Sequence, residues 1–218
     1  MKHCLVIGYH SDIFQRVKPL LMEDGWILTD VERLSAPELS MLPRWEMVLI
    51  TMGRVAPVGN WWDASFDEVQ MCIESNLTKP LRLLRMVWNR AAQNASVIWF
   101  SGSNPQKIMK GYAPYNVCKM AVNKLIEQLD FETPNVKFVA FGPGYVPTKI
   151  HRATLAAGWP NERIARGDDG TPTDKLYEAL KFCIEAPKAV VGGRNICVSD
   201  LPLKGEMTND TFKLRRVQ

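Results

Sequence analysis

Short apolar runs recur along the chain, and most of them end at a glycine or at a polar residue. Runs of this kind are typical of strands that are buried on both faces of a parallel sheet. We expect strands at residues 4–7, 26–29, 47–51, 96–100, 136–141 and 195–198.

Between these runs, hydrophobic residues recur every three or four positions, which is the period of an amphipathic helix. We expect helices at 13–22, 66–92, 115–129 and 173–185, and short helical turns at 36–39 and 153–157. Ser11 or Asp12 can cap the first helix, and Pro19 should bend it. Pro80 cannot donate to the carbonyl oxygen of Asn76, so that carbonyl is expected to be free to bind a water molecule.

Strands that alternate with helices predict an α/β fold, here a Rossmann-like, doubly wound parallel sheet in three layers. The segment 31–45 between the second and third strands is short and polar, so we expect a sheet one βα unit shorter than usual. No linker or repeat is visible, and a single domain is expected over 1–218. We expect a nucleotide-binding half at 1–53, a catalytic and substrate half at 54–200, and a C-terminal tail at 201–218. The tail is expected to fray from residue 208.

Composition narrows the class of protein. Hydrophobic residues make up 46% and charged residues 23% of the 218 positions, which is ordinary for a globular protein. The net charge of +4 is small and the basic residues are spread out, so no nucleic-acid partner is expected. No apolar run is long enough for a membrane helix, and the first one is too short for a signal peptide. We therefore expect a cytoplasmic protein with no membrane partner.

The five cysteines are odd in number and scattered, with no Cys-x-x-Cys pair. This usage fits buried thiols in a reducing compartment and argues against a disulfide framework or a zinc site. His10 and His151 are expected to be ordinary loop histidines, because no third ligand for a metal ion is evident. No metal site is therefore predicted.

Tyr115 and Lys119 open the helix expected at 115–129 and give the first indication of catalytic chemistry. Residues four apart lie on one face of a helix, one turn above the other, so both side chains point the same way. An ammonium beside a phenol favours the phenolate and lowers its pKa from about 10. A tyrosine tuned in this way can exchange a proton with an alkoxide near neutral pH.

The first strand ends at Gly8, and the second strand ends at Asp30, about 20 residues later. Strand, glycine turn, helix, strand and then an acidic residue is the layout of a dinucleotide-binding unit. The glycine pattern of such a unit is poor here, so this layout alone is a weak indication.

Several further motifs fall in one order along the chain: Thr51-Met52-Gly53, Asn76-Leu77-Thr78, Tyr115-x-x-x-Lys119 and Pro143-Gly144-Tyr145-Val146-x-Thr148. With these motifs, and with Gly8 after the first strand, the chain resembles the short-chain dehydrogenase/reductase family over about residues 3–200. The family has Asn-Ala-Gly at the place of the first motif. After the first strand it has Gly-x-x-x-Gly-x-Gly, of which this chain keeps only the first glycine.

Asp12 and Phe14 stand at the positions of the two missing glycines. A carboxylate about 5 Å from a phosphate would repel it by about 3 kcal/mol at an effective dielectric constant near 20. Either Asp12 turns away as a helix cap, or Arg16 offsets its charge, or the cofactor binds weakly. Phe14 must pack differently from a glycine.

The resemblance implies an oxidoreductase that transfers a hydride between a nicotinamide cofactor and a small carbonyl or alcohol substrate. Tyr115 would be the general acid/base, Lys119 would lower its pKa and hold the nicotinamide ribose, and Asn76 would hold a water molecule by its main-chain carbonyl. A serine would polarise the carbonyl oxygen. Ser103, the nearest hydroxyl on the loop side, is preferred, and Ser101 is the alternative.

The resemblance also implies a cofactor site and an oligomer. Thr148 would bind the carboxamide and Asp30 the adenosine ribose, and a carboxylate there favours NAD over the 2′-phosphate of NADP. A homodimer or homotetramer is expected, pairing the helices 66–92 and 115–129 across a two-fold axis. The implied cofactor-binding residues are Gly8, Ile13, Asp30, Gly53, Tyr115, Lys119, Pro143, Gly144, Val146 and Thr148.

The segments 54–65 and 149–170 are rich in helix and strand breakers and are expected to select the substrate. Trp61 and Trp62 either line the mouth of the substrate site or anchor their loop on the core. A second function stays open, in which a protein of the same fold has a lost or weakened cofactor site and acts as a binding or regulatory module. Asp12, Phe14 and the short nucleotide half favour that alternative.

Overall fold

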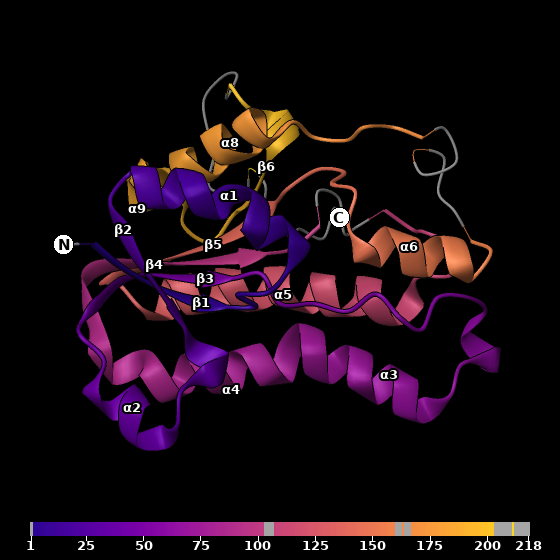
Figure 1. Ribbon diagram of the computed structural model, residues 1–218, viewed down its shortest axis with the longest axis horizontal. Helices are drawn as coiled ribbons and strands as arrows, with labels where there is room; N and C mark the ends of the chain where they lie inside the picture. The colour runs from indigo at the N-terminus through magenta and orange to yellow at the C-terminus, as the bar shows by residue number, and fades with distance from the viewer. Residues whose placement is uncertain (1, 103–106, 160–162, 164–166, 203–210, 212–218) are drawn as a thin grey trace.

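A computed structural model gives the structure of residues 2–102, 107–159, 163, 167–202 and 211. In this part of the chain, six strands form one parallel sheet in the order β2-β1-β3-β4-β5-β6 (Figure 1). The strands are β1 Lys2–Ile7, β2 Trp26–Asp30, β3 Trp45–Ile50, β4 Ala91–Phe100, β5 Val136–Gly142 and β6 Asn195–Cys197. The predicted Rossmann-like α/β fold is confirmed.

Helices cover both faces of the sheet. Their bounds are α1 Asp12–Glu23, α2 Ala36–Met41, α3 Phe66–Ile73, α4 Lys79–Val87, α5 Ala113–Glu132, α6 Lys149–Ala156, α8 Thr173–Glu185 and α9 Lys188–Val191. Figure 1 shows α1, α8 and α9 on one face and α2, α3, α4 and α5 on the other, so the three predicted layers are present. None of the helices within the described ranges is long and apolar enough to cross a membrane.

Successive side chains of β1 point to opposite faces of the sheet and pack into the two hydrophobic cores. Cys4 and Val6 pack in the core with α1 and α8, whereas Leu5 and Ile7 pack in the core with α4 and α5. All four side chains are fully buried. Because both faces of the strand are covered, its sequence is a continuous apolar run instead of an alternating one.

The connection from β2 to β3 is short, as the sequence predicts. It holds one 3-10 turn, Val31–Arg33, and α2, and then passes β1 to start β3 on the other side. No strand pairs beyond β2 in the described part of the chain, so the sheet is one βα unit shorter than usual. The change of direction between β1 and β3 leaves a crevice at the carboxyl ends of these strands, where open α/β sheets bind ligands.

The predicted single helix over 66–92 is wrong in its continuity. A π turn, Glu74–Thr78, separates α3 from α4. Pro80 has no backbone N–H, and the preceding turn is widened so that the N–H of Lys79 bonds to the carbonyl of Glu74. Asn76 lies inside this turn, and the free main-chain carbonyl expected of it stays a prediction.

The end of that predicted helix is also wrong, because residues 88–90 form a 3-10 turn and β4 already begins at Ala91. Asn94 has a left-handed backbone (φ 61) within β4, which asparagine tolerates better than most residues. The pairing of β4 with β3 shifts register in the same region. Because of this irregularity, residues 91–95 do not have the continuous apolar sequence of a buried strand, and the strand was predicted to start only at residue 96. Of the tail expected to fray, 208–218, only Thr211 lies within the described residues.

Candidate active site

A cleft of about 150 Å³ lies at the carboxyl ends of β1, β3, β4 and β5. Its walls come from the first turn of α1, the residues after β3 and β4, the start of α5, and the segment that joins β5 to α6. The predicted site residues that line it are Ile13, Gly53, Tyr115, Lys119, Pro143, Gly144, Val146 and Thr148. Segments far apart in the sequence therefore meet at one place, in agreement with the motif-based prediction.

Tyr115 and Lys119 share one face of α5, as their spacing predicts. The Lys119 Nζ lies 5.4 Å from the centroid of the Tyr115 ring. The Lys119 side chain is only 4% exposed, and its Nζ donates a hydrogen bond of 2.9 Å to the carbonyl oxygen of Phe100. The ammonium is thus held between the end of β4 and the tyrosine ring, facing the cleft.

The electrostatics of this pair differ from the prediction. Burial raises the pKa of Tyr115 above its usual value, and Cys72 and Tyr112 act in the same direction. Burial lowers the pKa of Lys119 to about 8. The expected net lowering of the phenol pKa is not found, because loss of hydration is the largest influence on it. Tyr115 is therefore a protonated acid at neutral pH.

Asn76 lies beneath the cleft and does not line it. Its side chain is fully buried, and its Nδ2 donates to the carbonyl oxygens of Arg54 at 2.6 Å and Cys72 at 2.9 Å. Its Oδ1 is buried with no hydrogen-bond partner among the described residues. A Cβ on Gly53 would come within 2.8 Å of this Oδ1 and 3.5 Å of the Lys119 Nζ, so the glycine keeps that space open. The sequence assigned the water to the main-chain carbonyl of Asn76, and the unpaired side-chain oxygen is a further acceptor for it near the lysine.

The two candidate serines have different outcomes. Ser103, the preferred one, lies outside the described residues. Ser101 lines the cleft and is buried. Its hydroxyl donates to the Asn123 Oδ1 at 2.6 Å, so its proton is directed into α5 while its oxygen borders the cleft.

Gly8 and Asp30 are not brought to the cleft wall. The N–H of Gly8 donates to the Glu32 carboxylate at 2.8 Å. Gly8 has a φ of +96°, and a Cβ there would lie 2.4 Å from a backbone nitrogen after β3, so only glycine fits. Asp30 lies at the end of β2, where its carboxylate pairs with His10 at 3.2 Å and Arg33 at 3.4 Å.

Of the two predicted caps of α1, Ser11 is the one that the structure has, and Asp12 is the first residue of the helix instead. Ser11 is the N-cap of α1 and accepts from the N–H of Phe14 at 3.2 Å. The Asp12 Oδ2 instead accepts from the N–H of Lys149, the first residue of α6, at 2.6 Å. Phe14 takes the place of the absent glycine by burying its ring fully in the core under α1. Arg16 does not offset Asp12, because its guanidinium donates to the carbonyl of residue 147.

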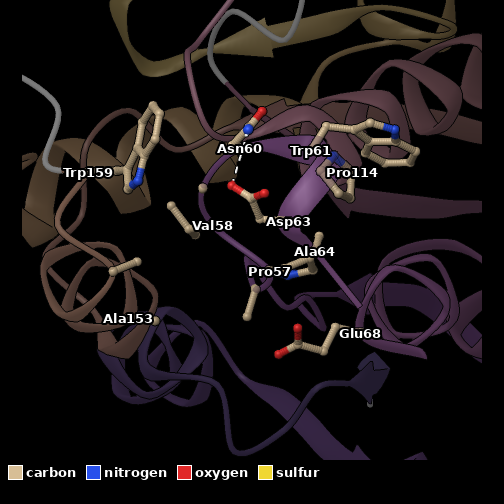
Figure 2. Close-up of a pocket in the computed structure, with 13 residues that line it drawn as sticks. Pro57, Val58, Asn60, Trp61, Asp63, Ala64, Glu68, Pro114, Ala153 and Trp159 are labelled. Carbon is tan, nitrogen blue, oxygen red and sulfur yellow. Dashed lines mark hydrogen bonds between the residues drawn. The ribbon is translucent and has the colours of Figure 1, made fainter. Parts of the chain in front are cut away.

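A larger cavity of about 430 Å³ lies between the two segments that were expected to select the substrate. Figure 2 shows Trp159 and Ala153 on one side, Trp61 on the other, and the Asp63 carboxylate between them, bonded to Asn60. Of the two neighbouring tryptophans, Trp61 lines the cavity, whereas Trp62 does not and is 85% exposed. The cavity is lined by Ala56, Pro57, Val58, Gly59, Asn60, Trp61, Asp63, Ala64, Glu68, Pro114, Ala153, Ala157 and Trp159.

The two cavities share their supporting elements. Pro114 lines the larger cavity and the next residue, Tyr115, lines the cleft. Along α6, Lys149 and His151 line the cleft and Ala153 lines the larger cavity. The two cavities are therefore neighbours along α5 and α6.

All five cysteines are described, and each is buried without a disulfide, as predicted. Among the described residues, no group of three His, Cys, Asp or Glu side chains is placed to hold a metal ion. His151 accepts from the N–H of Thr148 at 3.2 Å and packs edge-on against Tyr145, and burial lowers its pKa. Its ring therefore supports the wall of the cleft.

Sequence reasoning missed Lys149 and His151 as cleft residues. His151 follows Thr148 by three positions, the spacing of a capping box, and that spacing could have placed it at the start of α6. The contact of Lys149 with Asp12 joins positions 137 residues apart, and no local pattern announces it.

Comparison with known proteins places this geometry in context. The family model described as short chain dehydrogenase matches residues 47–157, about half of the chain. No curated protein sequence matches the chain. The matched range includes the asparagine of the π turn and the Tyr115 and Lys119 motif, and it begins after the incomplete glycine pattern.

Solved structures of similar fold span nearly the whole chain. An aldohexose dehydrogenase from Thermoplasma acidophilum has a TM-score of 0.75 and 15% identity, covering 95% of this chain and 96% of that one. A small-chain dehydrogenase in complex with NADPH has a TM-score of 0.75 and 14% identity, with 90% and 95% covered. A variant of actinorhodin polyketide ketoreductase with NADPH has a TM-score of 0.73 and 17% identity, with 90% and 95% covered. Identities this low establish a shared fold and nothing finer.

Proposed function

The chain belongs to the short chain dehydrogenase family, and from that premise we propose that it transfers a hydride between a nicotinamide cofactor and a carbonyl or alcohol. One observation carries the proposal: Tyr115 and Lys119 lie together on the wall of a cleft at the switch point of the sheet. The same cleft is bordered by Gly53 and Thr148, two positions of the family motifs.

The residues around the cleft fit the nicotinamide end of such a cofactor. Gly53 and Lys119 border the cleft and would face the nicotinamide ribose, and the unpaired Asn76 Oδ1 beneath them would accept from an ordered water molecule. Thr148 would hold the carboxamide, and Asp30, at the end of β2, would hold the adenosine ribose. Because a carboxylate repels a 2′-phosphate, we infer a preference for NAD over NADP.

The chemistry divides between the cofactor and the chain. When bound, the cofactor supplies or accepts the hydride. Tyr115 donates its proton to the substrate oxygen in the reductive direction, for which a raised pKa keeps it protonated at neutral pH. Lys119, with a pKa of about 8, holds the ribose and passes protons between the tyrosine and the water at Asn76. A serine, Ser103 or Ser101, polarises the substrate oxygen.

The larger cavity is the substrate subsite in this proposal, and its charge favours some substrates over others. The carboxylates of Asp63 and Glu68 line it, and no described lining residue is basic. An aldehyde that carries a carboxylate should therefore have a kcat/KM about tenfold lower than an aldehyde of equal length that carries an amine. Steady-state kinetics with such a pair of substrates measures the preference.

A matched set of variants isolates the cause of this preference. The double substitution Asp63→Asn and Glu68→Gln should abolish it, because the cavity then carries no charge. Asp67→Asn removes a charge from the same turn of α3 outside the cavity lining and should leave the preference unchanged. Equal preference in the wild type and the double variant would remove the two carboxylates from substrate selection.

We infer a homodimer or homotetramer paired through α3, α4 and α5. Large apolar side chains stay exposed on these helices, with Phe66 at 71%, Val117 at 67% and Phe131 at 85% exposure. Contiguous exposed apolar patches on a monomer mark interaction surfaces, and we infer that these side chains contribute to one. Sedimentation velocity at micromolar concentration should show a dimer or a larger species, and a monomer would contradict the pairing.

Cofactor binding separates this function from that of a binding or regulatory module. The quenching of protein fluorescence on addition of NADH and NADPH gives the two dissociation constants directly. Saturable binding, tighter for NADH, supports the oxidoreductase. Binding too weak to saturate at about millimolar concentrations of either cofactor, well above the usual substrate range, would favour the module.

A further inference from the structure

Three contacts join the first turns of α1 to the end of the β5–α6 connection and the first residue of α6. The Asp12 Oδ2 accepts from the N–H of Lys149 at 2.6 Å, and its Oδ1 lies 3.8 Å from the Lys149 Nζ. The Arg16 Nη2 donates to the carbonyl oxygen of Pro147 at 3.1 Å. We call this set of contacts the clasp.

The clasp lies where a dinucleotide would have to pass. Asp12 and Lys149 both line the cleft, from opposite walls. The cleft measures about 150 Å³, whereas sites for small molecules and cofactors commonly have about 300–1,000 Å³. A ligand that carries a pyrophosphate must therefore separate the two walls and displace the Asp12 carboxylate.

The carboxylate of Asp12 already occupies an anion-binding position. It takes the backbone N–H at the first residue of α6 and the nearby ammonium of the same residue, Lys149, as a phosphate oxygen would. Asp12 and an incoming pyrophosphate thus compete for the same donors, and they also repel each other.

We propose that Asp12 and Lys149 set the affinity for pyrophosphate-containing cofactors, with Asp12 opposing them and Lys149 offsetting Asp12. This inference rests on the proposed function, since it assumes a dinucleotide in this cleft. The affinity of the site for such a cofactor is therefore low, because the cofactor must displace the Asp12 carboxylate from Lys149 before it can bind.

Substitutions of Asp12 and of Lys149 should change the affinity in opposite directions. Asp12→Asn keeps an oxygen that can accept from the N–H of residue 149 but removes the negative charge, so binding should tighten. Lys149→Met leaves the backbone N–H in place but removes the cation, so binding should weaken. A contact that merely supports the fold would weaken binding in both variants.

The experiment measures dissociation constants of the full chain for NADH and for ADP-ribose, which carries the pyrophosphate without the nicotinamide. At low salt, Asp12→Asn should bind both ligands about tenfold more tightly or better, and Lys149→Met should bind them about tenfold more weakly. Adenosine, which has no phosphate, should bind equally to all three proteins. Titration calorimetry gives these constants without any turnover.

Asp24→Asn is the matched control. Asp24 caps the other end of α1 and forms a comparable ion pair with Lys181 at 2.7 Å, away from the cleft lining. Its substitution should leave all dissociation constants unchanged. Rising salt should reduce the difference between the wild type and Asp12→Asn, because screening weakens the repulsion.

The outcomes keep this inference separate from the proposed function. If the wild type and Asp12→Asn bind NADH and ADP-ribose equally well, the clasp does not control affinity and the oxidoreductase proposal stands. If neither protein binds either ligand, the proposed function fails, and the clasp inference fails with it. Tighter binding by Asp12→Asn together with weaker binding by Lys149→Met supports the inference.

Discussion

Replacing Tyr115 with phenylalanine is expected to lower kcat by about 10²- to 10⁴-fold and to leave the dissociation constant of NADH nearly unchanged. Tyr115 lines the cleft beside Lys119, and its phenol is the proton donor assigned to the substrate oxygen. The substitution removes that proton and keeps the ring that packs against Lys119. Stopped-flow or steady-state assays of carbonyl reduction measure the loss.

Tyr112→Phe is the control for this prediction. Tyr112 lies three residues earlier, and its hydroxyl donates to the Thr154 Oγ1 at 3.1 Å, so it serves the packing of α6. Its loss should reduce stability more than kcat. Because the pKa of Tyr115 is raised, carbonyl reduction should proceed at neutral pH, whereas alcohol oxidation, which needs the phenolate, should accelerate as the pH rises. A Tyr115→Phe protein with wild-type kcat would contradict the assigned role.

Lys119→Met is expected to lower kcat by about 10²-fold or more and, at the same time, to stabilise the fold at pH 7. The pKa of Lys119 falls from 10.5 to about 8, which corresponds to a cost of about 3 kcal/mol for keeping the buried group charged. Losing its hydrogen bond leaves the Phe100 carbonyl without this donor, which costs about 1–2 kcal/mol. A net gain of about 1–2 kcal/mol in the free energy of unfolding should remain.

The pH dependence of this gain follows from the direction of the shift. The folded protein releases the Lys119 proton at a lower pH than the unfolded chain does, so the destabilisation is fully present below pH 8. It is relieved as the pH rises from about 8 to 10.5. The stability advantage of Lys119→Met should therefore shrink over that range, as urea unfolding at several pH values can measure.

A second buried lysine provides the control for Lys119. Lys137 on β5 is 7% exposed, burial lowers its pKa, and it donates to the carbonyls of Ile184 and Ala186 outside the cleft lining. Lys137→Met should retain its kcat. An advantage of Lys119→Met that is absent at pH 7, or that grows toward pH 10, would contradict the charged, desolvated state of Lys119.

The sheet and most of the cleft could be predicted from the sequence because local patterns encode them. Buried parallel strands have continuous apolar sequences, which are easy to recognise. Gly53 follows the strand β3, whereas Tyr115 and Thr148 lie at the starts of the helices α5 and α6. Since the carboxyl ends of parallel strands lie at one edge of the sheet, the order of the motifs suffices to bring them together. The segment between β2 and β3 is too short to hold a further strand and helix, so the missing βα unit could also be predicted from the sequence.

Other features depend on the whole environment and leave no local pattern. The direction of the Tyr115 pKa shift depends on how much water the fold removes, which the spacing to Lys119 does not encode. The partner of Asp12 lies 137 residues away on a helix whose start was not predicted. The π turn before Pro80 is a structural response to a proline that the sequence shows but whose form it does not specify.

One measurement tests the central claim most directly. The wild type and Tyr115→Phe are incubated with NADH deuterated at the reactive carbon of the nicotinamide and with an amine-bearing aldehyde, and the alcohol product is analysed by mass spectrometry. The wild type should place deuterium on the former carbonyl carbon. The variant should form the same labelled product at least about 10²-fold more slowly. An unlabelled product from the wild type, or labelled product formed at the same rate by both proteins, would contradict the account.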